Sequence, residues 1–366
     1  MRIIGPEEVA TDRRLRAELD NLRAARDLAG LRGRQDVRVG LTLALDEAAL
    51  WRDLRELWSW SLELADDRSL DDHPQRIGVL GAAAEAARLT GELDRAVELA
   101  EQALALAGED APPEQVHVGL RALGSVAHFR GDFASARDLW IRSGLGRRVI
   151  SGGWFASAAL AASYGGDPAE ARRLLDLAGP AIRGSGCLSH AAFLSYVEGE
   201  VRATAAPEEA LPFYLDAIDT ARSAGTMFVA GVAGVALASA RTRLGDVEGA
   251  ADGFADLLGL WERTGHATQL WTTARNAAGL LVAAGLRRTA ALLLVVADAQ
   301  PGAAAVGPAI ARHSGRVFVL PEQVVDADEL ADVRAEAERL TTGEVLDRAR
   351  AELRELAAQG SRVTPP

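Results

Sequence analysis

Apolar residues recur along most of the chain at the spacing of one face of an α-helix. One stripe, at positions i, i+4, i+7 and i+11, consists of Val116, Leu120, Leu123 and Ala127. A second stripe begins after a short break and consists of Phe133, Ala136 and Trp140. Two apolar stripes joined by a short polar break indicate a helix hairpin, because each helix needs a partner to bury its apolar face.

The breaks themselves recur with a nearly constant period. A small residue, an acidic or proline-containing step and then an alanine are found six times, and the alanines are Ala96, Ala136, Ala171, Ala210, Ala250 and Ala290. The steps between these alanines are 40, 35, 39, 40 and 40 residues. A regular period indicates a repeat architecture in which each unit stacks on its neighbours. We expect six hairpins whose helices have roughly 17 residues and a length of about 25 Å.

The residues at each break have the chemistry that ends one helix and starts the next. The clearest case is the segment Gly166-Asp167-Pro168-Ala169-Glu170. Glycine accepts the left-handed conformation that ends a helix, and aspartate accepts a backbone N–H from the first turn of the following one. Proline suits the first helical position, and a glutamate three residues after the cap completes the signal. Each marker alanine is expected where the two helices cross closely, about 8–10 Å apart.

The flanks of the array also have helical patterns and are expected to cap it. Helices are predicted over about 11–30 and 46–65, the latter with Trp51, Leu54, Trp58 and Leu62 on one face. After the array we expect a bend around 301–308, a helix from Asp326, another over about 344–359, and a disordered tail. The predicted fold is all-α, an α-solenoid of about six hairpins. Its division is an N-terminal helical cap (1–75), the repeat array (76–300), C-terminal capping helices (301–358) and the tail (359–366).

The hairpin unit resembles the tetratricopeptide repeat, with Leu123-Gly124 on a first helix and Ala136 twelve residues after that glycine. With a period near 40, the array is similar to the tetratricopeptide-like C-terminal module of large ATP-dependent transcriptional regulators of the LuxR-type, MalT-like and antibiotic-regulatory class. The segments that carry this second resemblance are 19–25, 81–89, 261–265, 271–276 and 341–343. The resemblance implies a sensor or interaction module in signal-dependent control of transcription. The nucleotide-binding and DNA-binding modules of that class have no counterpart here.

Composition excludes several classes of function. The chain of 366 residues is 49% hydrophobic and 25% charged, which is enough apolar material for a folded core. Its formal net charge of −12 is unsuited to direct binding of nucleic acid. It contains no lysine, so neither a Schiff-base amine nor a phosphate-loop lysine is present. One cysteine permits no internal disulfide, and neither a signal peptide nor an apolar run of about 20 residues is visible. We therefore expect a cytoplasmic protein without a membrane segment.

The candidate reactive groups are few. Neither a Gly-x-Ser-x-Gly nor a His-Glu-x-x-His motif occurs, and the segment 144–148 has only part of a dinucleotide-binding turn. His117 and His128 lie about 16 Å apart along one helix, too far to share a metal ion. Cys187 and His190 form the one candidate thiolate pair, against the simpler interpretation as a loop or buried thiol. The segment 71–73, with two aspartates and a histidine, is interpreted as a solvated loop. No cofactor, metal site or enzymatic activity is predicted.

The inner surface of the array holds the candidate binding site. In a superhelix of such hairpins, the first helix of each pair lines the concave side, and positions 15, 11 and 8 residues before each marker alanine face away from the partner helix. The predicted groove residues at these positions are Arg88, Arg121, Ser125, His128, Ser163, Arg202 and Arg275, with Glu85 as the opposing charge. Guanidinium groups bind carboxylates and phosphates. Six layers of roughly 10 Å give a groove of about 60 Å, the length of about 18 extended residues.

These features lead to three hypotheses of function. The first is a non-enzymatic interaction module of a transcriptional or signalling regulator, which binds an acidic protein segment, a peptide or a small effector in the groove. The second is a self-assembling scaffold, a homo-oligomer formed through the end caps or the segment that contains Trp51 and Trp58. The third is an enzyme with an unrecognised site around Cys187 and His190. The plain alternative for the groove itself is a solvated inner face.

Overall fold

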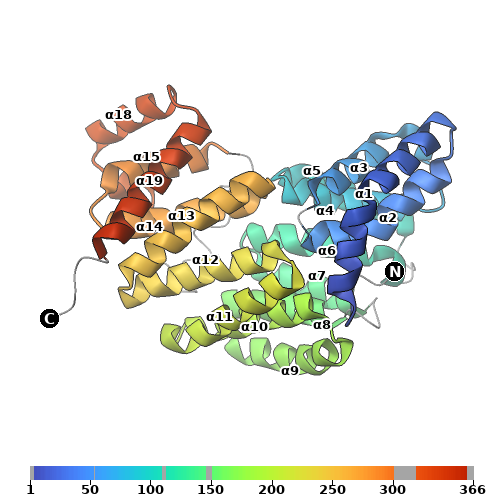
Figure 1. The fold of residues 1–366 in the computed structure, drawn as a ribbon, viewed down its shortest axis with the longest axis horizontal. Helices are drawn as coiled ribbons and strands as arrows, with labels where there is room; N and C mark the ends of the chain where they lie inside the picture. Colours follow the sequence, from blue (N-terminus) through green and yellow to red (C-terminus); the bar gives the residue numbers. More distant parts are fainter. Residues whose placement is uncertain (1–3, 53, 109–112, 146–150, 301–318, 361–366) are drawn as a thin grey trace.

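Every regular element that the structure describes is helical (Figure 1). The computed structural model describes residues 4–52, 54–108, 113–145, 151–300 and 319–360, and no strand occurs within them. The N-terminal helices are α1 (Glu8–Leu31), α2 (Gln35–Trp51) and α3 (Arg55–Asp66), followed by the short 3-10 turn η1 (Arg68–Leu70). The C-terminal helices are α17 (Pro321–Val324), α18 (Ala327–Ala337) and α19 (Thr342–Gly360).

The six predicted units lie between these ends, in the described part of the chain, as six pairs of helices that pack on each other in sequence order. The pairs are α4 (Arg76–Leu89) with α5 (Leu93–Ala107), α6 (Pro113–Phe129) with α7 (Phe133–Leu145), α8 (Ser151–Tyr164) with α9 (Pro168–Ser185), α10 (Leu188–Ala203) with α11 (Pro207–Ala224), α12 (Met227–Leu244) with α13 (Val247–Thr264), and α14 (Ala267–Ala283) with α15 (Arg287–Asp298). All six marker alanines lie in the first turns of the second helices and are fully buried. The prediction of a hairpin repeat is confirmed.

The predicted capping is confirmed at the breaks with Asp132, Asp167 and Asp246, whereas the helices that start after Glu92, Ala206 and Leu286 have no side-chain cap. Gly166 has the positive φ of 82° that lets the chain turn out of α8. The Asp167 carboxylate then accepts a hydrogen bond of 3.0 Å from the backbone N–H of Glu170, and Pro168 takes the first helical position of α9. The break is therefore specified by local residues alone.

Large aromatic side chains of second helices lie across glycines of first helices. A Cβ atom added to Gly231 would lie 2.3 Å from the Trp261 ring, and one added to Gly199 would lie 2.6 Å from the Tyr214 ring. Gly124 has the same relation to Trp140, at 2.7 Å. These glycines let the two helices of a hairpin approach closely while an aromatic ring fills the space between them.

The N-terminal region differs from the prediction. We expected one helix over about 46–65, but α2 ends at Trp51 and α3 begins at Arg55. The break coincides with tertiary contacts: the Trp51 carbonyl accepts a hydrogen bond of 2.8 Å from Thr226, and Arg52 donates to the Ala224 carbonyl. A local helical pattern cannot predict contacts with residues more than 170 positions away.

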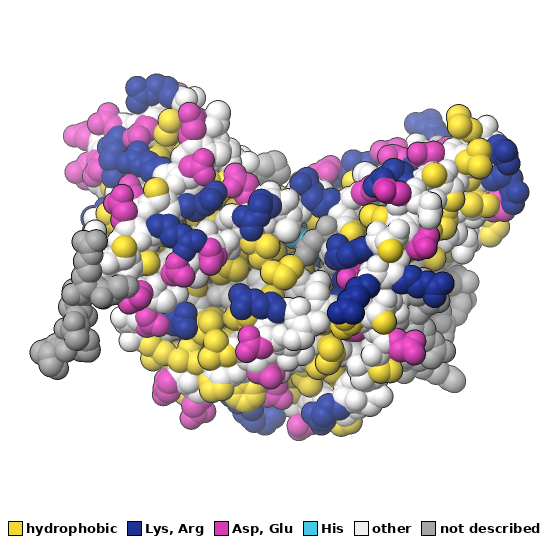
Figure 2. All heavy atoms as spheres, viewed as in Figure 1, with side chains coloured by type: hydrophobic (Ala, Val, Ile, Leu, Met, Phe, Trp, Pro, Cys, Tyr) yellow, Lys and Arg dark blue, Asp and Glu magenta, His cyan; other side chains and the backbone are white. Residues whose placement is uncertain are grey.

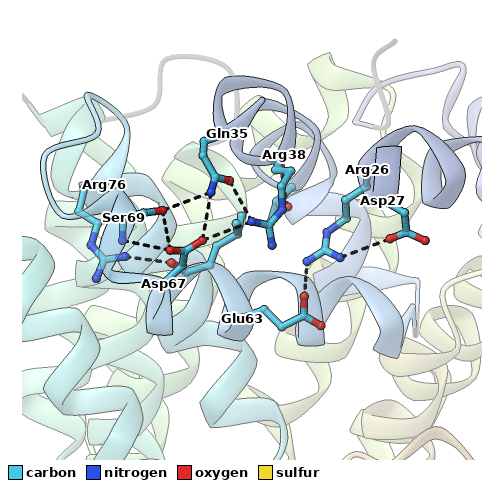
Figure 3. Close-up of polar contacts among 10 residues, drawn as sticks. Arg26, Asp27, Gln35, Arg38, Glu63, Asp67, Ser69 and Arg76 are labelled. Atoms are coloured by element: carbon cyan, nitrogen blue, oxygen red, sulfur yellow. Dashed lines mark hydrogen bonds and ion pairs between the residues drawn. The ribbon is translucent and has the colours of Figure 1, made fainter. Parts of the chain in front are cut away.

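Ion pairs connect the N-terminal helices to each other (Figure 3). Arg26 of α1 pairs with Glu63 of α3, and Arg38 of α2 pairs with Asp67 at 3.3 Å. Arg76, at the start of α4, donates to two backbone carbonyls near the end of α3. These contacts attach the N-terminal cap to the first hairpin.

The two ends of the molecule approach each other across its inner face. In the view of Figure 1, the N-terminal helices lie on one side and the C-terminal helices on the other, and α10 to α12 run between them. Helix α2 contacts α12, α1 contacts α11, and α4 contacts α14. The hydroxyl of Thr268 in α14 donates to the Arg88 carbonyl in α4 at 3.0 Å. The expected open groove of about 60 Å is therefore wrong: the inner face is bridged, and a shorter cavity remains.

The C-terminal helices fold back on the array. Helix α19 packs along α13 and α15, and the Asp326 side chain caps α18 as predicted, accepting from the Glu329 N–H at 2.9 Å. The predicted bend at 301–308 lies outside the described residues, as does the predicted tail of 359–366 except for its first two residues, which belong to α19. Among the described helices, α12 alone has the length and hydropathy of a membrane span, and half of it is buried inside the fold. A core helix that is hydrophobic on all sides meets the same criteria.

Candidate functional site

A cavity of about 140 Å³ remains inside the bridged inner face. Its wall is mainly aromatic, and the aromatic residues that line it are Trp51, Phe129, Trp140, Trp154, Tyr164, Phe193, Tyr196 and Phe228. The chain has 7 Trp, 3 Tyr and 8 Phe, so eight of its few aromatic side chains are gathered at this one place. Such a concentration, in a chain with only 5% aromatic residues, marks the cavity as the candidate site.

The aromatic wall depends on both the array and the N-terminal cap. Most of its residues lie on first helices of hairpins: α6, α8, α10 and α12. Trp51, at the end of α2, completes the wall: its ring lies edge-on to Phe193 at 5.6 Å and to Phe228 at 6.3 Å between centroids. The cavity exists in this form only while α2 rests on α10 and α12.

A buried cluster of charged residues reaches the cavity through Glu85 and Arg88. Glu85 accepts from Arg88 at 2.8 Å and from Arg121 at 3.2 Å, and Arg121 also pairs with Asp46 at 3.1 Å. The guanidinium of Arg88 lies over Phe129 and that of Arg121 over Trp154, at 5.9 and 5.7 Å from the ring centroids. Charged and aromatic groups are thus held in contact at the cavity wall.

The two arginines fix the charge of Glu85. Burial raises the pKa of this carboxyl group, but the guanidinium groups of Arg88 and Arg121 outweigh burial and hold its pKa below the ordinary value. Glu85 is therefore a carboxylate at neutral pH, and it occupies donors that a ligand would otherwise use.

Three of the seven predicted groove residues line the cavity: Arg88, Ser125 and His128. The other four do not. Arg121 is fully buried in the charged cluster, and Ser163 is buried outside the cavity lining.

The remaining two predicted residues, Arg202 and Arg275, are neutralised within the chain. Arg202 pairs with Glu198 and lies over the Phe213 ring at 4.2 Å, and Arg275 pairs with Asp298. The expected row of arginines open to an acidic ligand is therefore wrong, because carboxylates of the same fold already occupy these side chains.

The aromatic wall was not predicted because the expected inward positions include no aromatic residue. In α8 these positions were Ala156, Leu160 and Ser163, of which Leu160 lines the cavity, together with Trp154, Ser157 and Tyr164. In α12 the expected inward positions began at Val235. Val235 lines the cavity, and so do Phe228 and Val232, which precede it. The signal that was available is the recurrence of an aromatic residue on successive first helices of a chain with only 5% aromatic residues.

The candidate thiolate pair is not a reactive pair. The Cys187 thiol donates to a Glu8 carboxylate oxygen at 2.7 Å, and burial together with this carboxylate raises the pKa of the thiol to about 12. Burial lowers the pKa of His190 to about 4, so its imidazole is neutral at neutral pH. A protonated thiol that donates to a carboxylate is the reverse of an activated nucleophile.

The other candidate groups have structural surroundings. Asp71 pairs with Arg76 at 3.1 Å, and His73 accepts from the Gln75 backbone N–H at 3.1 Å. His128 is packed among aromatic rings, with Tyr164 at 5.4 Å between centroids. Within the ranges that the structure describes, no three His, Cys, Asp or Glu side chains are arranged to hold a metal ion. The partial glycine motif at 144–148 lies mostly outside the described residues.

The two tryptophans considered for self-assembly, Trp51 and Trp58, make contacts within the chain. Trp58 is 3% exposed, donates to the Ala49 carbonyl at 2.9 Å and lies edge-on to His266. Trp51 lines the cavity. Trp58 is therefore withheld from a second copy, and Trp51 is half-buried.

No protein-family model matches the chain, and no curated protein matches it in sequence.

Proposed function

We propose that the chain is a non-enzymatic, tetratricopeptide-like solenoid that acts as a sensor module and binds a small, uncharged aromatic effector in its inner cavity. The observation that carries the proposal is the aromatic wall, formed by residues from α2 and from successive hairpins. Aromatic walls hold aromatic ligands through offset stacking and edge-to-face contacts, which contribute about 0.5–1.5 kcal/mol each beyond the burial of area.

The size of the cavity limits the ligand. An engineered apolar cavity of about 150 Å³ binds benzene, and the cavity here has about 140 Å³. A molecule with one aromatic ring and small substituents matches this volume. A peptide side chain of similar size fits as well, but a peptide backbone does not.

The charged cluster favours an uncharged ligand with polar substituents. The formal charges of Glu85, Asp46, Arg88 and Arg121 balance, so a ligand carboxylate has to compete with Glu85 for Arg88. Side chains that can hydrogen-bond a hydroxyl or carbonyl group of the ligand are present in the lining: Ser125, Ser157, Gln269 and Thr272.

The bridged architecture gives the ligand a way to signal. The lining residues come from α2, α4, α12 and α14, which meet across the inner face. A ligand that contacts both sides binds the closed form better than an opened form and therefore shifts the population towards it. In a cytoplasmic regulator of transcription or signalling, partner proteins that contact the outer helices would respond to this shift in population.

The test measures the binding of phenol, indole and benzoate. Tryptophan fluorescence and the shift of Tm report the binding. We expect phenol and indole to bind saturably and raise Tm, and benzoate to bind at least tenfold more weakly, about 1.4 kcal/mol. Two variants that fill the cavity, Ser125→Phe and Val232→Phe, should abolish binding and keep the helical circular dichroism spectrum.

The matched control is Ser59→Phe, which adds the same side chain at an exposed serine of α3. It should bind the ligands as the wild type does. Absence of saturable binding by all three ligands, or unchanged binding in both filled variants, contradicts the proposal.

A further inference from the structure

A second and larger groove, of about 480 Å³, lies on the outside of the array. Helix α12 forms its floor, α11 and α13 form its sides, and α19 reaches its rim. The floor consists of small residues, among them Gly231, Gly234 and Ala238, and the apolar side chains of the lining that remain accessible are the exposed Met227 and the half-buried Leu260. The cavity-lining residues Phe228 and Val232 lie on a different face of α12, so the groove is separate from the effector site.

Arginines surround this groove on an otherwise acidic chain. Five line it, and Asp256 is the one carboxylate among its lining residues. Figure 2 shows basic side chains beside hydrophobic ones on this side of the molecule. Three of the arginines already have carboxylate partners: Arg241 with Asp246, Arg350 with Glu262, and Arg354 with Asp252 and Asp256.

The other two arginines, Arg222 and Arg263, are exposed, and neither has a carboxylate partner among the residues that the structure describes. Both lie at the same end of the groove. Helices α11 and α13 each join α12 through a two-residue turn, so both run antiparallel to it and end where α12 begins. The first turn of α12 contains no acidic residue. Two guanidinium groups therefore lie at one end of the groove without a carboxylate partner among the described residues, each in the last turn of its own helix, beside the negative end of that helix's dipole.

We propose that this groove binds an amphipathic helix of a partner protein, with glutamate or aspartate residues at the edge of the helix's apolar face. The apolar face of the partner covers the exposed Met227 and the half-buried Leu260, and its carboxylates pair with Arg222 and Arg263. The groove extends along α12 from Met227 to Arg241, about 21 Å, which matches about 14 residues of helix.

The probe is a synthetic peptide of about 14 residues that forms a helix, with leucine and alanine on one face and three glutamates at the edge of that face. A second peptide has glutamine at the three glutamate positions. Binding is measured by fluorescence anisotropy, without any cavity ligand. We expect saturable binding of the glutamate peptide that weakens with salt, and at least tenfold weaker binding of the glutamine peptide.

The variants assign the binding to the groove. Arg222→Gln with Arg263→Gln should weaken binding at least tenfold, about 1.4 kcal/mol. Gly253→Leu should block the groove by a different mechanism, because its new side chain projects from the wall. The control is Arg13→Gln with Arg14→Gln, which removes the same charge from exposed positions of α1.

Three results overturn the proposal. They are equal binding of the two peptides, unchanged binding in the double variant, and an equal loss in the control. A concentration-dependent dimer that the double variant abolishes would instead show that a second copy of this chain occupies the groove. Sedimentation detects such a dimer. None of these outcomes depends on the inner cavity, so failure here leaves the effector proposal standing.

Discussion

Cys187 and His190 lie three residues apart, and the sequence therefore allowed a thiolate pair. Their neighbours decide otherwise. Glu8, which is 179 residues away, accepts from the Cys187 thiol and from the backbone N–H and hydroxyl of Ser189. His190 lies edge-on to Trp51 at 5.8 Å. Both potentially reactive residues thus support the contact between the N-terminal helices and α10.

Burial of neutral His190 makes stability depend on pH. The folded-state pKa of about 4 lies below the ordinary value of 6.5. Above about pH 6.5 the residue is neutral in both states, and its full contribution is present. As the pH falls from about 6.5 towards 4, the unfolded chain takes up a proton that the folded chain does not, and stability on the order of 3 kcal/mol is lost.

We predict that His190→Gln removes most of this pH dependence. The measurement is urea unfolding at about pH 7.5 and about pH 4.5. His73→Gln, in the loop before α4, is the control and should keep the difference of the wild type. The same loss of stability in wild type and His190→Gln would show that other groups cause it.

At the scale of the elements, close contact within a hairpin depends on a small residue opposite a large one. Alanine has the higher helix propensity, yet glycine occupies three helical positions where an aromatic ring of the partner helix leaves no room for a Cβ atom. Glycine in the first helix therefore lowers the stability of a hairpin through its poor helix propensity. The aromatic ring that packs against the glycine raises that stability.

We predict that Gly231→Ala destabilises the fold by about 1–3 kcal/mol, because the new methyl group overlaps Trp261, whose ring is almost fully buried. Gly40→Ala in α2 is the control: no atom lies within 4 Å of its added Cβ, and it should stabilise by about 0.5–1 kcal/mol. Chemical denaturation measures both. Stabilisation by Gly231→Ala would show that Trp261 moves aside without cost.

At the scale of the whole molecule, a few buried polar contacts hold the N-terminal helices against the junction of α11 and α12. Arg52 is 2% exposed, lies 3.4 Å from Glu8 and donates to the carbonyl of Ala224. Thr226, two residues after Ala224, donates to the Trp51 carbonyl. These contacts close the inner cavity, because Trp51 forms part of its wall.

We predict that Arg52→Gln opens the inner face at a cost of about 3–5 kcal/mol, because Glu8 loses its buried counter-charge. Small-angle scattering should show a larger radius of gyration. Cys187 should become reactive towards thiol reagents, whereas in the wild type its pKa of about 12 and its burial keep it inert.

Arg14→Gln, an exposed change on α1, is the control and should leave both measurements unchanged. A compact Arg52→Gln variant with an inert thiol would mean that apolar packing alone closes the molecule.

The sequence by itself determined the hairpins, their period, the capping residues and the buried marker alanines. Each of these depends on interactions within one or two turns of helix, so the residues that cause them are close together in the chain. It also placed Arg88, Ser125 and His128 at the candidate site. Only the tertiary structure decided the break after Trp51, the pairing of Arg202 and Arg275, and the closure of the inner face. Closure follows from small rotations that accumulate from hairpin to hairpin, and from contacts such as that between Thr268 and Arg88, 180 residues apart, which no local pattern contains.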